Sequence, residues 1–452
     1  MDWKQYYQSH RMTALEAVRL IKSGDRVFLT GNCSVPLHLL SALVEYAPNL
    51  QNVELCQALT VAGSEYVSPE MEGHLRVNSF FVSHNVRKAI HEGRADFTPV
   101  LLSEFPLLFQ KGILSLDVAL VHISPPDEDG YCRLGIEAGL TRSQAESAKL
   151  VIAQVNKQMP SMMGDTLFHV TQLGAIVEVD EPLAELPMTN DTDHQLVQRI
   201  AGFIADRIPD GATLQLGIGG IPDAVLGYLY EKKDLGIHSE LFSDGVIDLV
   251  EKGIINGSRK TIHTGKITAG FILGTRRLYD WVHNNPLIEI RRTEYVNNPF
   301  IIAQNKNMVA INSAIEIDLT GQVCSDSLGF EFYSGIGGQV DFVRGSAMSR
   351  RGKSIMVLPS TTEDGKISRI VPHLSSGSGV VVTRGDIHYV VTEYGIAYLH
   401  GKSIRERAMM LINIAHPDFR DELLEAARRQ GYIYRDQMLP VVLYPKEYEV
   451  HW

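Results

Sequence analysis

Residues 212–248 read ATLQLGIGGIPDAVLGYLYEKKDLGIHSELFSDGVID, and this stretch decides the fold. Apolar residues alternate as in a strand up to Leu216, a glycine turn closed by Pro222 follows, and apolar residues then recur at helical spacing up to Leu229. A second short apolar run carries Glu240. The pattern predicts strand, glycine turn, helix and parallel strand, which is the repeating unit of an open α/β sheet.

The glycine turn is a candidate binding element. Gly217, Gly219 and Gly220 lead into the start of the predicted helix. Backbone N–H groups and the positive end of the helix dipole at such a turn can hold a phosphate or a carbonyl oxygen. Adjacent parallel strands end at the same edge of a sheet, so we expect Glu240 to lie near the turn.

Three interpretations of this stretch remain open on its residues alone. A dinucleotide site expects G-x-G-x-x-G with an acid about 20 residues further on. Gly217, Gly219 and Glu240 fit that pattern, but Pro222 stands where the third glycine belongs. In a second interpretation Glu240 is a nucleophile and the turn holds its substrate. In a third, the glycines form only a tight turn and Glu240 is a solvated acid at a strand end.

The composition excludes several classes of protein. The chain has 452 residues, of which 44% are hydrophobic and 21% charged, and this length predicts two or three domains. A net charge of −11 argues against nucleic acid or an anionic membrane as the main partner. The first residues are polar, and no run approaches the roughly 20 apolar residues of a membrane span. We therefore expect a cytoplasmic protein.

Cysteine and histidine spacing predicts no metal site. The four cysteines, Cys33, Cys56, Cys132 and Cys324, form no C-x-x-C pair and have no histidine at ligand spacing. We expect free, mostly buried thiols. His84, His238 and His263 lie near the candidate segments, where a hydrogen-bonded structural role is the simpler interpretation.

An internal repeat relates the two parts of the chain. GNCSVPLHLLSALVE at 31–45 resembles GIGGIPDAVLGYLYE at 217–231, and the 186-residue offset between Gly31 and Gly217 also places Glu54 on Glu240. Three further pairs follow at offsets of 190 or 191 residues: Arg87 with Arg277, Glu104 with Glu294, and Gly130 with Gly321. We predict two related open α/β domains, residues 1–190 and 191–452.

The differences between the halves place the chemistry in the second one. The first turn has Cys33 and Ser34 in place of the glycine pair, so its backbone cannot approach a ligand as closely. The second half alone has another glycine cluster, SGIGGQVDF at 334–342. We expect the second half to carry the reacting groups and the first to supply a wall of the cleft between them.

Three features downstream complete the sequence pattern. Arg350, Arg351 and Lys353 form either an anion-binding loop or an exposed basic loop. GVVVTRGDIHYVVTEYG at 379–395 predicts two strands. Two helices should follow, the first capped by Ser403 and the second with Pro417 in its first turn.

Six stretches together resemble the acetyl-CoA hydrolase/transferase family of coenzyme A transferases. They are GIGGIPDAVL, HSELFSDGVIDLV, YVNNPF, AINSAIEIDLTGQV, SGIGGQVDF and TEYGIAYLHGKSIRERA. The resemblance covers essentially the whole chain with its spacing intact. It favours the interpretation of Glu240 as a nucleophile.

The resemblance implies a role for each candidate residue. Glu240 matches the family glutamate that forms a covalent coenzyme A thioester. Gly338 matches a backbone donor to the reacting oxygen, and Asn297 a side-chain donor, although the adjacent Asn298 could take that place. The coenzyme A loop then comprises Gly217, Ile218, Gly219, Gly220 and Ile221, with Gly338 also contacting coenzyme A.

The resemblance also implies the reaction. Coenzyme A would pass between an acyl-CoA and a small carboxylate, with acetate and 4-hydroxybutyrate or butyrate as the expected acids. An acyl-CoA hydrolase is the alternative enzyme, and a dinucleotide-binding protein is a distant one. We expect coenzyme A as a substrate rather than a permanently bound cofactor, and a homo-oligomer, most simply a dimer.

Overall fold

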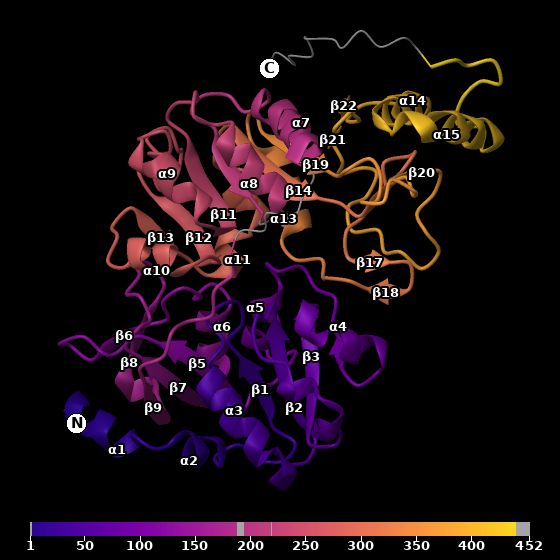
Figure 1. The fold of residues 1–452 in the computed structure, drawn as a ribbon. Helices are drawn as coiled ribbons and strands as arrows, with labels where there is room; N and C mark the ends of the chain where they lie inside the picture. Colours follow the sequence, from indigo (N-terminus) through magenta and orange to yellow (C-terminus); the bar gives the residue numbers. More distant parts are fainter. Residues whose placement is uncertain (1, 188–193, 218, 440–452) are drawn as a thin grey trace.

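The structure is a computed structural model that describes residues 2–187, 194–217 and 219–439. The ribbon divides into two α/β parts stacked one on the other, with the N-terminal half in indigo to purple and the C-terminal half in magenta to yellow (Figure 1). The predicted boundary between residues 190 and 191 lies outside the described residues.

Each half is built on an open sheet. Within the described residues, seven parallel strands form the first sheet in the order β4-β3-β2-β1-β5-β7-β9. Their bounds are β1 Arg26–Leu29, β2 Val53–Ala58, β3 Leu75–Phe81, β4 Asp96–Phe97, β5 Val118–Ile123, β7 Leu150–Asn156 and β9 Ala175–Val179.

The second sheet has eight strands among the described residues, in the order β13-β12-β11-β10-β14-β19-β21-β22, parallel except for the last pair. Their bounds are β10 Thr213–Leu216, β11 Gly236–Phe242, β12 Ile267–Ile272, β13 Ile288–Ile290, β14 Met308–Ser313, β19 Lys353–Val357, β21 Tyr389–Thr392 and β22 Gly395–Tyr398. Smaller pairings join β6 (Tyr131–Arg133) with β8 (Leu167–His169), β15 (Glu316–Asp318) with β16 (Val323–Cys324) and β20 (Ile370–Val371), and β17 (Ser327–Leu328) with β18 (Glu331–Phe332).

Helices connect and cover these strands (Figure 1). Those of the first half are α1 Trp3–His10, α2 Ala14–Val18, α3 Leu37–Tyr46, α4 His84–His91, α5 Phe105–Gln110 and α6 Thr141–Ser147. Those of the second half are α7 His194–Ala205, α8 Gly220–Gly227, α9 Gly245–Glu251, α10 Arg276–Val282, α11 Thr293–Val296, α12 Pro299–Ile302, α13 Gln339–Met348, α14 Ile404–Ile414 and α15 Pro417–Arg429.

The strand orders confirm that the two halves are related. β10 to β14 take the places of β1 to β5, and β19 and β21 take those of β7 and β9. Arg87 and Arg277 lie on the equivalent helices α4 and α10. Gly130 and Gly321 both adopt positive φ, at 88° and 93°, a conformation that favours glycine.

The structure contradicts one predicted correspondence, that of Glu54 with Glu240. The strand registers pair Val27 with Leu55 in the first half and Thr213 with Gly236 in the second. The alignment of the glycine turns places Val27 on Thr213, so the strand partners Leu55 and Gly236 also correspond. Four residues further along these strands, the counterpart of Glu240 is Leu59, which lies five residues beyond Glu54. The first half inserts these residues through the longer helix α3 and the 3₁₀ turn Ala47–Asn49 that follows it.

Glu54 therefore lies near the amino end of its strand and has a structural role. Its carboxylate pairs with Arg26 at 2.9 Å and accepts a hydrogen bond from Asn78 at 2.9 Å. Burial raises the pKa of this carboxyl, but the Asn78 and Arg26 contacts outweigh that effect and hold it below its usual value.

The carboxyl edges of the two sheets face each other. The segment after β6 bonds to β12, with Ile272 N donating to Ile136 O at 3.0 Å and Gly139 N to Gly270 O at 2.9 Å. At the end of β3, Phe81 packs directly against the glycine cluster of the second half. Loops that follow parallel strands, the usual place for ligand sites in open sheets, thus meet between the halves.

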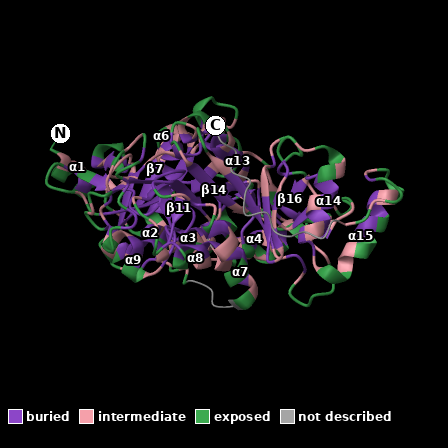
Figure 2. Ribbon diagram, turned by 90° about the horizontal axis from the view of Figure 1, so that it is seen from above, coloured by how far each residue is buried: buried purple, intermediate pink, exposed green. Residues whose placement is uncertain are grey.

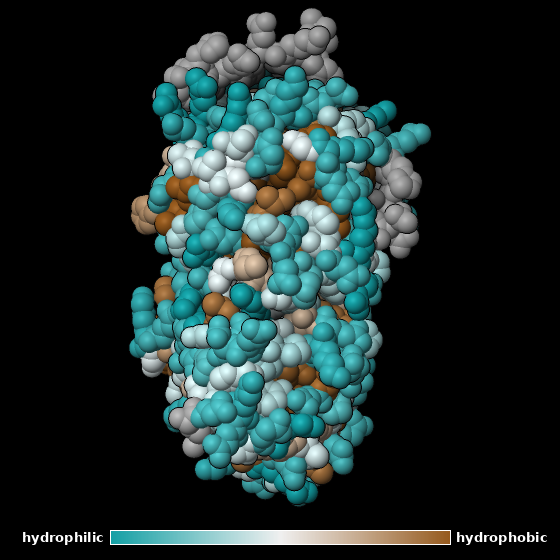
Figure 3. Space-filling model, turned by 90° about the vertical axis from the view of Figure 1, so that its left-hand side faces the viewer, coloured by the Kyte–Doolittle hydropathy of each residue, from teal (hydrophilic) through white to brown (hydrophobic). Residues whose placement is uncertain are grey.

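The strands supply the core. Buried residues concentrate along the strands of both sheets (Figure 2), and one apolar cluster includes Phe28 and Phe105 of the first half together with Phe271 of the second. Hydrophilic residues cover most of the face in Figure 3, and hydrophobic ones appear there in separate patches. All four cysteines are free and buried, as predicted.

The C-terminal segment agrees with the sequence in its helices and differs in one strand. Ser403 caps α14 with a capping box, and Pro417 begins α15. Of the two strands predicted within residues 379–395, the second is present as β21. The first is absent from the main sheet, because Val382 makes only an isolated bridge to Val323, and β22 follows β21 instead. Among the described residues, no helix has the length and apolar character needed to cross a membrane.

Candidate active site

The glycine turn has the predicted form. It follows β10 and leads into α8, with Gly219 at the N-cap and Pro222 in the first turn. Gly219 has a φ of 113°, which a residue with a side chain rarely adopts. Gly217, Gly220 and Ile221 are half-buried, and Ile218 lies outside the described residues.

Glu240 lies on β11, close to the carboxyl edge. Its Oε2 accepts a hydrogen bond from Asn297 Nδ2 at 2.8 Å. Asn297 is fully buried just after α11, whereas Asn298 caps α12 by accepting a bond from Phe300 N at 2.9 Å. The structure therefore distinguishes the two asparagines and places Asn297 against the glutamate.

Gly338 lies on the same carboxylate. It occupies the N-cap position of α13, and its backbone hydrogen bond stabilises the ionised form of Glu240. A side-chain carbon at this position would overlap both Glu240 Oε2 and Asn297 Nδ2. The close approach requires glycine, and the three residues predicted for catalysis come together in one place.

Two opposing effects set the charge of Glu240. Burial raises its pKa from 4.5 to about 7, while the donors Asn297 and Gly338 act to lower it. Burial is the larger effect, so the net shift of the pKa is upward. Glu240 as a whole residue is only partly buried, and its carboxyl group lies at the buried end.

Asp341 and Ser103 join this site from positions that the sequence analysis missed. Asp341 is buried in the first turn of α13, and it accepts bonds from Ser103 Oγ at 2.8 Å and Ser103 N at 3.2 Å. Burial raises the pKa of Asp341 to about 7, and the nearby Glu240 charge adds to this. The only sequence signal was an aspartate three residues after Gly338.

The nearby histidines have structural roles. His238 is fully buried and donates from Nε2 to Val296 O at 2.9 Å, and burial lowers its pKa to about 3, which keeps it neutral. His263 pairs with Glu289 at 2.7 Å and with the Tyr295 hydroxyl at 2.7 Å. Within the part of the chain that the structure describes, no three His, Cys, Asp or Glu side chains are grouped to hold a metal ion.

The basic loop lies away from the site. Gly338 begins α13, and Arg350 and Arg351 follow its other end. Ten helical residues span about 15 Å. The loop therefore does not contact Glu240, and its role as an anion-binding loop or an exposed basic loop stays a prediction.

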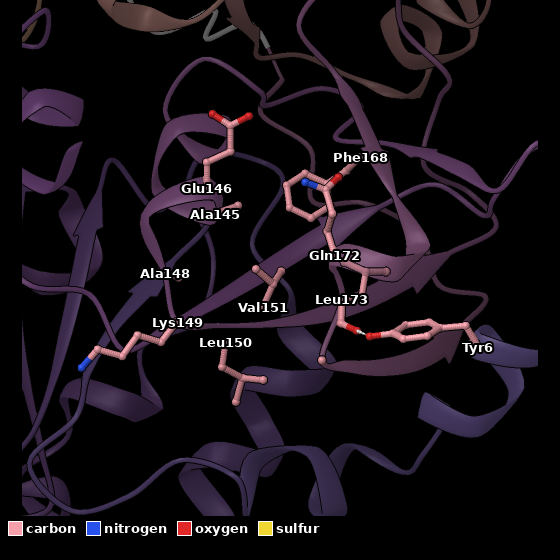
Figure 4. A pocket seen from close by; sticks show the side chains of 11 residues that line it. Tyr6, Ala145, Glu146, Ala148, Lys149, Leu150, Val151, Phe168, Gln172 and Leu173 are labelled. Atoms are coloured by element: carbon pink, nitrogen blue, oxygen red, sulfur yellow. Dashed lines mark hydrogen bonds between the residues drawn. The ribbon is translucent and has the colours of Figure 1, made fainter. Parts of the chain in front are cut away.

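The cavity in Figure 4 lies in the first half, away from Glu240. It has a volume of about 310 Å³ and lies between α1, α6 and β7. Its charged groups are already paired, Glu146 with Arg292 and Lys149 with Asp117, and the Tyr6 hydroxyl donates to Leu173 O at 2.9 Å. None of the predicted site residues lines it.

Two related open α/β sheets that meet around a glutamate agree with the coenzyme A transferase class, and comparison with known proteins shows that class. The acetyl-CoA hydrolase/transferase N-terminal domain matches residues 1–187, and the C-terminal domain of the same family matches residues 274–427. The chain belongs to the acetyl-CoA hydrolase/transferase family.

Known relatives match nearly the whole chain. The 4-hydroxybutyrate coenzyme A transferase of Clostridium kluyveri is 47% identical over 95% of this chain and 100% of that protein. The butyryl-CoA:acetate CoA-transferase of Anaerostipes caccae is 38% identical over 95% of this chain and 98% of that protein. The crystal structure of 4-hydroxybutyrate CoA-transferase from Porphyromonas gingivalis has a TM-score of 0.82 and 42% identity, covering 95% of this chain and 100% of that one.

Proposed function

We propose that the enzyme transfers coenzyme A reversibly between an acyl-CoA and a small carboxylate, with acetate and 4-hydroxybutyrate or butyrate as the acids. The reaction passes through a coenzyme A thioester on Glu240. The observation that carries the proposal is the contact of the Glu240 carboxylate with Asn297 at 2.8 Å and with the Gly338 backbone. The names of the relatives support the choice of acids.

The chemistry proceeds in two attacks on carbonyl carbons. A Glu240 oxygen attacks the acyl-CoA carbonyl, the C–S bond breaks, and a mixed anhydride forms as the coenzyme A thiolate leaves. The thiolate then attacks the glutamyl carbonyl, the C–O bond breaks, and the free carboxylate departs from the glutamyl thioester. An acceptor carboxylate reverses these steps, so that no oxidant or reductant is needed.

The neighbours of Glu240 supply the electrostatic stabilisation. Each attack builds negative charge on a carbonyl oxygen. The Asn297 amide and the Gly338 N–H are donors beside the reacting group. A donor of this kind accelerates the reaction by about 10²- to 10³-fold. The loop of Gly217, Ile218, Gly219, Gly220 and Ile221 holds the coenzyme A.

The proposal includes the division of the chain at residue 190 and a site between the halves. The facing carboxyl edges of the sheets and the contact of Phe81 with the glycine cluster support it. The acyl-pantetheine end of the substrate occupies the space between the halves, because sites in two-domain enzymes commonly lie there.

Hydrolysis is the alternative activity. It differs only in that water, rather than a carboxylate, attacks the glutamyl thioester. We expect acyl-CoA consumption to depend on acetate, measured as the acetyl-CoA formed. Consumption at the same rate without any carboxylate would identify a hydrolase instead.

Pro222 weighs against a dinucleotide, because it stands where the third glycine of the dinucleotide pattern belongs. The six stretches that resemble the transferase family also favour coenzyme A over a dinucleotide. Tight binding of a nicotinamide dinucleotide without binding of acetyl-CoA would reverse the assignment.

A homodimer and a cytoplasmic location complete the proposal. The dimer follows from the family resemblance alone. Sedimentation at micromolar protein concentration should give about twice the mass of the chain, and a monomer under those conditions would contradict the dimer.

A further inference from the structure

The segment that carries Gly338 is attached to the first half along its length. Before the glycines, Arg87 Nε donates to Tyr333 O at 3.0 Å, and the guanidinium stacks over the Tyr333 ring at 3.8 Å. His91 Nε2 contacts Phe332 O at 2.9 Å. The Phe332 ring packs on Phe97 with centroids 5.1 Å apart.

The contacts continue through the glycines into α13. Leu102 N donates to Gly337 O at 3.0 Å. The next residue, Ser103, donates from its backbone N and its hydroxyl to the two oxygens of Asp341. Gly338 lies between these two attachment points, and Asp341 is 1% exposed.

We propose that Ser103 and Asp341 are positioning residues, through which the first half holds the Gly338 N–H against Glu240. This inference rests on the proposed function. The first half then does more than form a wall of the cleft, because it completes the catalytic arrangement of the second half.

The need for an anchor follows from the glycines themselves. Gly335, Gly337 and Gly338 offer little resistance to rotation, and Gly337 has a φ of 58°. A donor contributes to catalysis only when it is fixed in place, and a 1 Å displacement can cost about 10²-fold in rate. The bonds of Leu102 and Ser103 fix the backbone on both sides of Gly338.

Ser103→Ala tests the inference, because it removes one bond to Asp341 without touching Glu240. The chain offers a matched control in Ser375, which also donates from its backbone N and its hydroxyl to a buried carboxylate, Glu316, with both distances 2.8 Å. That pair lies entirely within the second half. Ser103→Thr keeps the hydroxyl and serves as the conservative variant.

The readout is the rate at which a coenzyme A adduct forms on the full-length enzyme at saturating acetyl-CoA, followed by intact mass. We expect Ser103→Ala to slow adduct formation about tenfold, with an apparent KM within about threefold of wild type. Ser103→Thr should restore most of the rate. Ser375→Ala should retain the wild-type rate even where its melting temperature falls.

A second pair of variants repeats the test on the acceptor side. Asp341→Asn should slow adduct formation at least as much as Ser103→Ala, while Glu316→Gln should not. The inference would be overturned if Ser103→Ala and Asp341→Asn both formed the adduct at the wild-type rate. It would also be overturned if the site and control variants lost rate equally, in proportion to their loss of melting temperature. Wild-type enzyme that forms no adduct would instead contradict the proposed function.

Discussion

At the scale of single residues, Glu240 is the proposed nucleophile, and its surroundings stabilise its negative charge only weakly. Burial moves its pKa to about 7, and its donors only partly compensate. Since the ionised form attacks, we expect kcat/KM to fall as the pH drops below about 7. A measured pH profile with no acidic limb between pH 6 and 8 would contradict this.

Asn297→Ala should change that profile in a defined direction. The amide stabilises the carboxylate, so its loss raises the pKa of Glu240 and moves the acidic limb to higher pH. The plateau rate should also fall by about 10²- to 10³-fold, because a donor to the reacting oxygen is lost. Asn298→Ala is the control, because the Asn298 side chain caps α12. The acidic limb of its pH profile should stay at the wild-type pH.

The same pKa shift predicts how stability depends on pH. Between pH 4.5 and about 7 the folded protein binds more protons at Glu240 than the unfolded chain does, so this group lowers stability as the pH rises through that window. Glu240→Gln removes the buried charge. Its melting temperature should exceed that of wild type at pH 8 and match it near pH 4, and a deficit at pH 8 would contradict the account.

The sequence identified some of these residues and missed others for physical reasons. The family resemblance selected Glu240, Asn297 and Gly338 because each lies within a short motif, and the structure brings the three together, while their catalytic roles stay predictions. Ser103 and Asp341 could not, because they meet across 238 positions of sequence. Glu54 was matched to Glu240 because strand register depends on connection length, which a glycine turn does not reveal.

At the scale of elements, the turn between β10 and α8 depends on the conformation of one glycine. Gly219→Ala would place a side chain at a φ of 113°, and such strain costs about 1–3 kcal/mol. We expect a lower melting temperature and a higher KM for acyl-CoA.

The same helix provides a control for this substitution. Gly227 is the last residue of α8, has no neighbour within 4 Å of an added side-chain carbon, and does not have a positive φ. Gly227→Ala should be neutral or stabilising by up to about 1 kcal/mol. Equal effects of the two substitutions on KM would mean that the conformation of the turn is unimportant for binding.

Elements with a strong local signal were predicted well. The capped helix α14 and the proline-initiated α15 occur as expected, because caps act within a few residues. The apolar run at 380–382 is not a strand of the main sheet, although its residues have high β propensity. Strand formation depends on a partner, and Val382 pairs instead with Val323 through a single bridge.

At the scale of the whole molecule, the repeat could be predicted from its glycine turns, and the order of seven strands that both sheets share confirms it; β22 is an addition to the second sheet. How the halves dock could not be predicted, because their contacts come from loops that the repeat does not share. Because the carboxyl edges of the two sheets face each other, the segment after β4 contacts α13 through the hydrogen bond from Ser103 to Asp341. The proposed site therefore lies between two related halves. Only the second half has a glutamate at the position of Glu240, because the first half has Leu59 there.

The most direct test of the account is the location of the covalent intermediate. Wild-type enzyme incubated with acyl-CoA should gain the mass of a coenzyme A thioester, and peptide mapping should place it on Glu240. Glu240→Gln should form no adduct and lose transfer by several orders of magnitude, whereas Glu54→Gln should keep both. An adduct on another residue, or near-normal transfer by Glu240→Gln without deamidation to glutamate, would contradict the central claim.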